Sequence, residues 1–98
     1  MLQRIVKLTF RQESAETFLR EVFDPSKEAI RAFPGCHSMY LLRDKAQPFI
    51  MFTYSVWESE EALERYRQST RFQNTWEKTK VLFGGRPEAW SCLMYEGY

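Results

Sequence analysis

The chain is poor in the residues from which most catalytic and metal sites are built. Its 98 residues include one histidine and two cysteines, and the cysteines, Cys36 and Cys92, do not form a C-x-x-C pair. One histidine cannot build a multi-histidine metal site, and no phosphate-binding glycine motif, G-x-S-x-G turn or H-E-x-x-H pair is present. We therefore expect no metal and no cofactor. The cysteines are interpreted as small strand residues, with a disulfide or a reactive thiol as alternatives.

Net charge and long hydrophobic runs are also lacking. Fourteen basic residues face thirteen acidic ones, and the signs alternate between Glu58 and Arg71 instead of clustering. This pattern disfavours nucleic-acid binding. No apolar run approaches the ~20 residues of a membrane span, and the first residues carry no apolar segment. We expect a cytoplasmic protein, not bound to a membrane, with a single domain over residues 1–98.

Aromatic residues, in contrast, are abundant. Phe, Tyr and Trp make up 16% of the chain. Aromatic rings bury large areas, so this content is typical either of a dense core or of a cavity that receives a flat ligand.

The segment from Phe49 to Trp57 predicts a strand that is apolar on both faces. Neither its odd-numbered nor its even-numbered residues include a charge. Helices can cover one face of its sheet, but a chain of this length lacks material to cover the other. A second copy of the same sheet is the simplest cover, so we expect a homodimer that pairs through the open sheet face.

Periodicity gives the order of the remaining elements. Strands are predicted over 3–10, 36–44, 49–57 and 88–95, with Arg4, Val6, Leu8 and Phe10 alternating against Ile5, Lys7 and Thr9 in the first. Ser14 and Ser59 are expected to cap helices, and a further helical piece begins near Ser69. Asp24 and Pro25 are expected to restart the first helix, and Gly84 and Gly85 to end the last. The order β-α-β-β-α-β predicts an α+β, ferredoxin-like fold with a four-stranded antiparallel sheet.

Candidate functional residues fall into three groups. His37 is the natural general base, although a half-exposed histidine without a chemical role is the alternative. Polar-tipped and apolar aromatics could line a cleft for a phenol or quinone, or could simply pack in the core. These substrate-binding candidates are Tyr54, Trp57, Tyr66, Phe72 and Trp76. Arg65, Arg67 and Arg71, beside several glutamates, indicate a solvated helix face, with anion binding as the alternative.

The chain resembles the antibiotic biosynthesis monooxygenase family of the dimeric α/β barrel superfamily. The resemblance is carried by Phe33-Pro34-Gly35-Cys36, by Leu41-Leu42-Arg43-Asp44, by Trp57-Glu58-Ser59-Glu60-Glu61-Ala62-Leu63-Glu64 and by Tyr66, Ser69, Phe72 and Trp76. It implies a dimer whose two sheets meet as a barrel, with a pocket between the sheet and the helices of each protomer.

The resemblance also implies chemistry. Some relatives oxygenate aromatic polyketides without metal or flavin, because the deprotonated substrate itself reduces dioxygen. Others degrade haem with an Asn, a Trp and an iron-ligating His, and ungapped matching puts Val6, Tyr66 and Trp76 at those places here, so haem degradation is not expected. Our leading hypothesis is a cofactor-independent monooxygenase acting on a hydroxylated aromatic or quinol-like compound, with His37 or a tyrosine assisting deprotonation. The alternative is a non-catalytic dimeric module on the same fold, because fold does not fix function.

Overall fold

The computed structural model describes residues 1–97, which form one antiparallel sheet covered by helices. The elements, in chain order, are β1 (Leu2–Thr9), a 3-10 turn (Gln12–Ser14), α1 (Ala15–Phe18), a π-helical segment (Leu19–Phe23), α2 (Asp24–Arg31), β2 (Cys36–Arg43), β3 (Ile50–Trp57), α3 (Glu60–Arg67), α4 (Thr70–Lys80) and β4 (Glu88–Leu93). The strand order in the sheet is β2-β3-β1-β4. This arrangement confirms the ferredoxin-like fold expected from the sequence.

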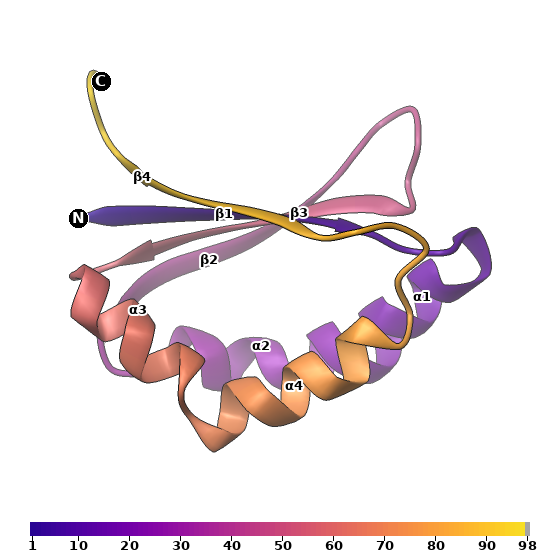
Figure 1. Ribbon diagram of the computed structural model, residues 1–98, viewed down its shortest axis with the longest axis horizontal. Coiled ribbons are helices and arrows are strands. Elements are labelled where there is room, and N and C mark those ends of the chain that lie inside the picture. The colour runs from indigo at the N-terminus through magenta and orange to yellow at the C-terminus, as the bar shows by residue number, and fades with distance from the viewer. Residues whose placement is uncertain (98) are drawn as a thin grey trace.

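The helices lie on one side of the sheet and leave the other side bare (Figure 1). The pairing register explains what each side carries, because side chains in a strand alternate between the faces. On the helix side, Met39, Ser55, Arg4 and Ser91 form one row across the four strands. The next row, on the bare side, is Tyr40, Tyr54, Ile5 and Trp90. We call the bare side the open face.

The first helical region differs from the expectation in its start and in its middle. Ser14 precedes α1 without a side-chain capping hydrogen bond, so the predicted cap is wrong. Asp24 is not a cap either, because the backbone stays helical through Phe23 and Asp24. The Asp24 N–H donates to the carbonyl of Leu19, five residues back, which widens the turn immediately before Pro25. The helix therefore continues through a π-turn, instead of ending and restarting.

Glycines in two loops allow those loops to pack closely against neighbouring elements. Gly35 has a φ of +90°, and a Cβ there would lie 2.5 Å from the Cβ of Ala62, so this turn requires glycine. Gly84 and Gly85 do not end α4, which stops at Lys80. Their N–H groups both donate to the Thr9 carbonyl, at 2.9 and 3.1 Å. The expectation that they terminate the helix is wrong, and they instead allow close approach to the end of β1.

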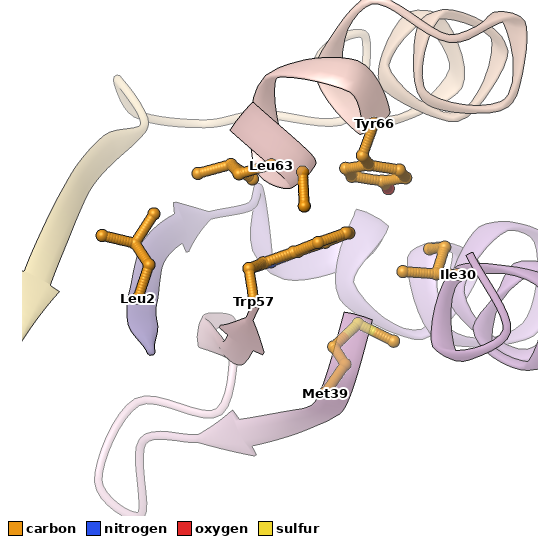
Figure 2. Packing of buried hydrophobic residues seen from close by; sticks show 7 residues of the cluster. Leu2, Ile30, Met39, Trp57, Leu63 and Tyr66 are labelled. Atoms are coloured by element: carbon orange, nitrogen blue, oxygen red, sulfur yellow. The ribbon is translucent and has the colours of Figure 1, made fainter. Parts of the chain in front are cut away.

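The core consists of two clusters between the sheet and the helices. One cluster surrounds Trp57, whose side chain is only 1% exposed and lies beneath Leu63 and Tyr66 of α3 (Figure 2). The other contains Phe10, Phe18 and Met51 at the opposite end of the sheet. The predicted caps of α3 and α4 are confirmed, because the Ser59 and Ser69 hydroxyls accept hydrogen bonds from Ala62 N and Phe72 N, both at 3.1 Å. These caps fix the starts of the two helices that cover the space between the clusters.

Candidate functional site

A cavity of about 350 Å³ lies between the sheet and its covering helices. Its floor comes from inward-facing strand residues and its roof from the helices and the π-helical segment. The floor includes Arg4, Val6, Leu8, Met39, Thr53, Ser55 and Trp57. The roof includes Phe18, Val22, Ile30, Leu63, Tyr66, Arg67, Phe72, Thr75, Trp76 and Thr79. This size falls in the range of small-molecule sites, and most of the lining is apolar.

Aromatic rings form a continuous wall along this cavity. Trp57 stacks on Tyr66 with ring centroids 5.0 Å apart, and Tyr66 meets Phe72 edge-on at 5.3 Å. Phe72 in turn stacks on Trp76 at 5.9 Å with an interplanar angle of 12°. The structure thus brings together four of the five predicted substrate-binding residues. Such a wall offers both stacking faces and edges to a flat ring.

Tyr54 and His37 lie elsewhere. Tyr54 is paired with Ile5 and Tyr40 in the row that faces away from the helices, because it is an odd number of residues from Trp57 along β3. His37 is exposed and stands in a β-bulge between Cys36 and Ser38. Neither residue lines the cavity. The expected convergence of Tyr54 with the other aromatics is therefore wrong for this cavity.

Tyr66 brings a hydroxyl to a largely apolar surface. Burial raises the pKa of Tyr66 to about 12, with a smaller contribution from Cys36 in the same direction. The phenol therefore stays protonated at neutral pH and can donate a hydrogen bond. It is a poor general base, because its anion is not populated there.

Two hydroxyl groups near the floor and the roof are already engaged. The Trp57 indole N–H donates to Ser55 Oγ at 3.0 Å, which holds the ring in place. Thr79 Oγ donates to the Thr75 carbonyl at 2.7 Å. Both hydrogen bonds offset the free-energy cost of burying these polar groups, and they restrict the motion of the cavity lining.

Arg4 is the site residue that the sequence interpretation missed. It stands on the floor in the inward-facing set of β1, half-buried, where its neighbours along the face are Leu2 and Val6. Its Nη1 donates to Ser91 Oγ at 2.9 Å. Burial and the nearby Arg67 lower the pKa of Arg4, and Glu64 partly opposes them. A charge in the apolar set of an alternating strand was the signal that could have identified it.

Comparison with known proteins places the chain in a family. The sequence profile described as "Antibiotic biosynthesis monooxygenase" matches residues 1–78. The chain therefore belongs to the antibiotic biosynthesis monooxygenase family, as its motifs indicate. No curated protein gave a match.

Solved structures agree on the fold. A crystal structure described as an antibiotic biosynthesis monooxygenase superimposes with a TM-score of 0.90 at 16% identity, covering 98% of this chain and 100% of that one. A conserved protein from Methanosarcina mazei gives 0.87 at 15% identity, covering 93% and 89%. The Rv0793 protein from Mycobacterium tuberculosis gives 0.85 at 20% identity, covering 98% and 96%. At these identities the likeness shows the fold alone.

The residues do not fit a haem site. The position that the resemblance assigns to an iron-ligating histidine holds Trp76, which lies between Phe72 and Phe83 with centroids 5.9 and 5.6 Å away. Within residues 1–97, no group of three or more His, Cys, Asp or Glu side chains could hold a metal ion. Across the same residues, none of the helices has the length and apolar character needed to cross a bilayer.

Proposed function

We propose that this protein oxygenates a small hydroxylated aromatic compound, of the quinol or anthrone type, inside the cavity of each protomer. The observation that carries the proposal is the aromatic wall from Trp57 to Trp76, in a cavity of about 350 Å³ on a family-typical scaffold. Stacking would hold the substrate ring, and the Tyr66 hydroxyl would donate to one of its oxygens.

The reaction needs no redox group from the protein, because the substrate supplies the electrons. For an anthrone, the ring methylene loses a proton and the resulting enolate passes an electron to dioxygen. The two radicals combine at that carbon, and the returning proton completes a hydroperoxide. Loss of water then leaves a carbonyl, so one oxygen atom enters the product and the other leaves as water. The cavity orients the substrate and stabilises its anion.

Oxygen uptake with dithranol and reduced menadione tests this proposal. We expect turnover above the uncatalysed rate in the wild type and a loss of about tenfold or more in Tyr66→Phe, since a donor to a developing oxyanion is removed. Tyr40→Phe is the matched control, because Tyr40 lies on the open face. Uptake equal to the uncatalysed rate across anthrones and quinols would refute the oxygenase. The His37→Asn variant tests separately whether that residue is the base.

We also propose that two copies pair through the open face. This face carries a row of Tyr40, Tyr54, Ile5 and Trp90 across all four strands, and Tyr40 and Trp90 are 58% and 46% exposed. A contiguous apolar surface of this kind marks an interaction site. The cytoplasmic location expected from the sequence stays a prediction.

A non-catalytic binding protein is the second candidate. Its support is that Tyr66 is held protonated and that the carboxylate of Glu88, which also lines the cavity, is paired with Lys7 at 3.8 Å. It would bind the same aromatic compounds without consuming oxygen. Binding by calorimetry together with no oxygen uptake would therefore favour this candidate.

A further inference from the structure

Arg4 is an unusual residue for the floor of an apolar cavity. Its strand neighbours on the same face are apolar, and the side chain is half-buried on the same face as Trp57 and Val6. Within residues 1–97 no carboxylate lies within 4.0 Å of it, and its hydrogen bond is to the neutral hydroxyl of Ser91. Burying a charge without an ionic partner is costly, so such a group is a candidate functional residue.

A second guanidinium lies nearby. Arg67 of α3 also lines the cavity, and its positive charge helps to lower the pKa of Arg4. Arg67 is paired with Glu64, whose Oε2 lies 3.6 Å from its Nη1. The three side chains together carry a net charge of +1, and Arg4 is the member whose charge is not neutralised. An arginine keeps its proton even with a lowered pKa, so the Arg4 end of the cavity is cationic at neutral pH. Glu88 also lines the cavity, and its carboxylate is paired with Lys7 at 3.8 Å.

We propose that Arg4, supported by Arg67, is an anion-binding end of the cavity that takes the ligand as an aromatic oxyanion, either a carboxylate or an ionised phenol. The proposal rests on the proposed function in taking this cavity as the ligand site. The ring would stack against the aromatic wall while its oxyanion meets Arg4, because a guanidinium donates strong, charge-assisted hydrogen bonds to such groups. An anion would also relieve the repulsion between the two arginines.

A positive charge beside the substrate would also promote the deprotonation that oxygenation requires. No side chain of the aromatic wall is suited to remove a proton, but a neighbouring positive charge lowers the pKa of a phenol or enol. The proton leaves to solvent, and the electron pair stays on the substrate oxygen beside Arg4. The substrate would then be held as the electron-rich anion that reacts with dioxygen. Arg4 would act by binding this anion and would not itself transfer the proton.

Naphthoate and its neutral isostere naphthamide are the probes, titrated by calorimetry into wild-type protein and variants. We expect wild type to prefer naphthoate, and Arg4→Gln to reduce naphthoate affinity by about tenfold or more while changing naphthamide affinity little. Arg4→Lys should keep part of the preference. Arg65→Gln removes the same charge from an exposed position of α3 that does not line the cavity, and should change neither affinity.

Naphthol distinguishes the two oxyanion sources. If an ionised phenol is bound, naphthol binding releases a proton, measured by repeating the titration in buffers of different ionisation enthalpy. Proton release that Arg4→Gln abolishes supports a phenolate ligand. Naphthol binding without proton release, alongside a naphthoate preference that depends on Arg4, supports a carboxylate ligand.

Several results would overturn the anion site. These are equal affinity of wild type for naphthoate and naphthamide, a preference that survives Arg4→Gln, or equal weakening of both probes in an Arg4→Gln protein that melts like wild type. Oxygen uptake with dithranol separates this failure from that of the proposed function. Uptake without anion preference refutes the anion site alone, and anion preference without uptake on any anthrone or quinol refutes the oxygenase alone.

Discussion

Each face of the sheet departs in part from the usual distribution of polar and apolar residues. The face that the helices cover carries Arg4, Ser55 and Thr53 beside its apolar residues. The face that no helix covers carries Tyr40, Tyr54, Ile5 and Trp90 in one row. In a monomer built only for stability, polar residues face water and apolar ones face the helices. Both departures therefore call for a functional reason.

These two departures assign a different task to each face. Polar groups under the helices fit a cavity that must recognise a ligand, since a few polar groups in an apolar lining give orientation and specificity. Exposed aromatic residues on the open face are typical of a surface that is buried against another protein. Because the same strands carry both sets, alternation alone separates ligand site from interface. Variants on adjacent residues can then test the two faces independently.

The largest effect is expected where the covered face is most tightly packed. Trp57→Ala should lower the free energy of unfolding by about 3–5 kcal/mol, the range for removing a buried aromatic side chain. Trp57 is 1% exposed and stacks on Tyr66. Urea denaturation measures the loss. Tyr54→Ala is the control from the same strand and opposite face, and an equal loss measured below the concentration at which subunits associate would break the comparison.

The second effect is on association. Tyr40→Glu would place a charge within the proposed interface, and we expect it to weaken self-association by about 2 kcal/mol or more, as for a central interface residue. Sedimentation should then show a species of 11.8 kDa in place of one twice that mass. Val81→Glu is the matched control, because Val81 is equally exposed, at 63%, but follows α4. A wild type that is monomeric at micromolar concentration would refute the interface.

The third effect is a pH dependence specific to the covered face. The pKa of Tyr66 is raised to about 12 in the folded protein, above its ordinary value of 10.0. Between these values the unfolded chain has released a proton that the folded chain retains, so stability is full below pH 10 and falls as the pH rises toward 12. The linkage amounts to about 1.4 kcal/mol for each unit of pKa.

Ultraviolet titration of tyrosinate absorbance checks this assignment. One late-titrating tyrosine should be present in wild type and missing in Tyr66→Phe. The same variant should lose stability less steeply between pH 10 and 12 than wild type does. A late component that persists in Tyr66→Phe would assign it to another tyrosine and remove the argument that Tyr66 is a hydrogen-bond donor.

Much of the fold could be predicted from the sequence because it rests on local patterns. Alternation and helical periodicity gave the four strands and their order, and Ser59 and Ser69 identified two helix starts. Ser14 and Asp24 failed as caps because the chain stays helical around them, with a π-turn that no short pattern reveals. The wrong role for Gly84 has a similar cause, since its contact with Arg11 is distant in sequence.

The site was predicted less well, for a different physical reason. Four aromatics converge in the cavity because α3 and α4 roof the sheet beside Trp57. Tyr54 was grouped with them although its parity in β3 puts it on the other face. Arg4 was grouped with the apolar residues of its strand by alternation, but it was not considered as a residue of the site. Parity along a strand was available in both cases and carries more information here than residue type.

The smallest expected effect tests whether the helices over the sheet can be destabilised without changing self-association through the open face. Ser69→Ala removes the hydroxyl that accepts from Phe72 N at 3.1 Å and donates to the Tyr66 carbonyl at 2.6 Å, so we expect a loss of about 1 kcal/mol in unfolding free energy. Ser14→Ala, at a buried helix start without a capping bond, should lower stability less. Self-association should be unchanged in both variants. If Ser69→Ala weakened association as much as Tyr40→Glu, the two faces would be coupled, and the separation of ligand site from interface would not hold.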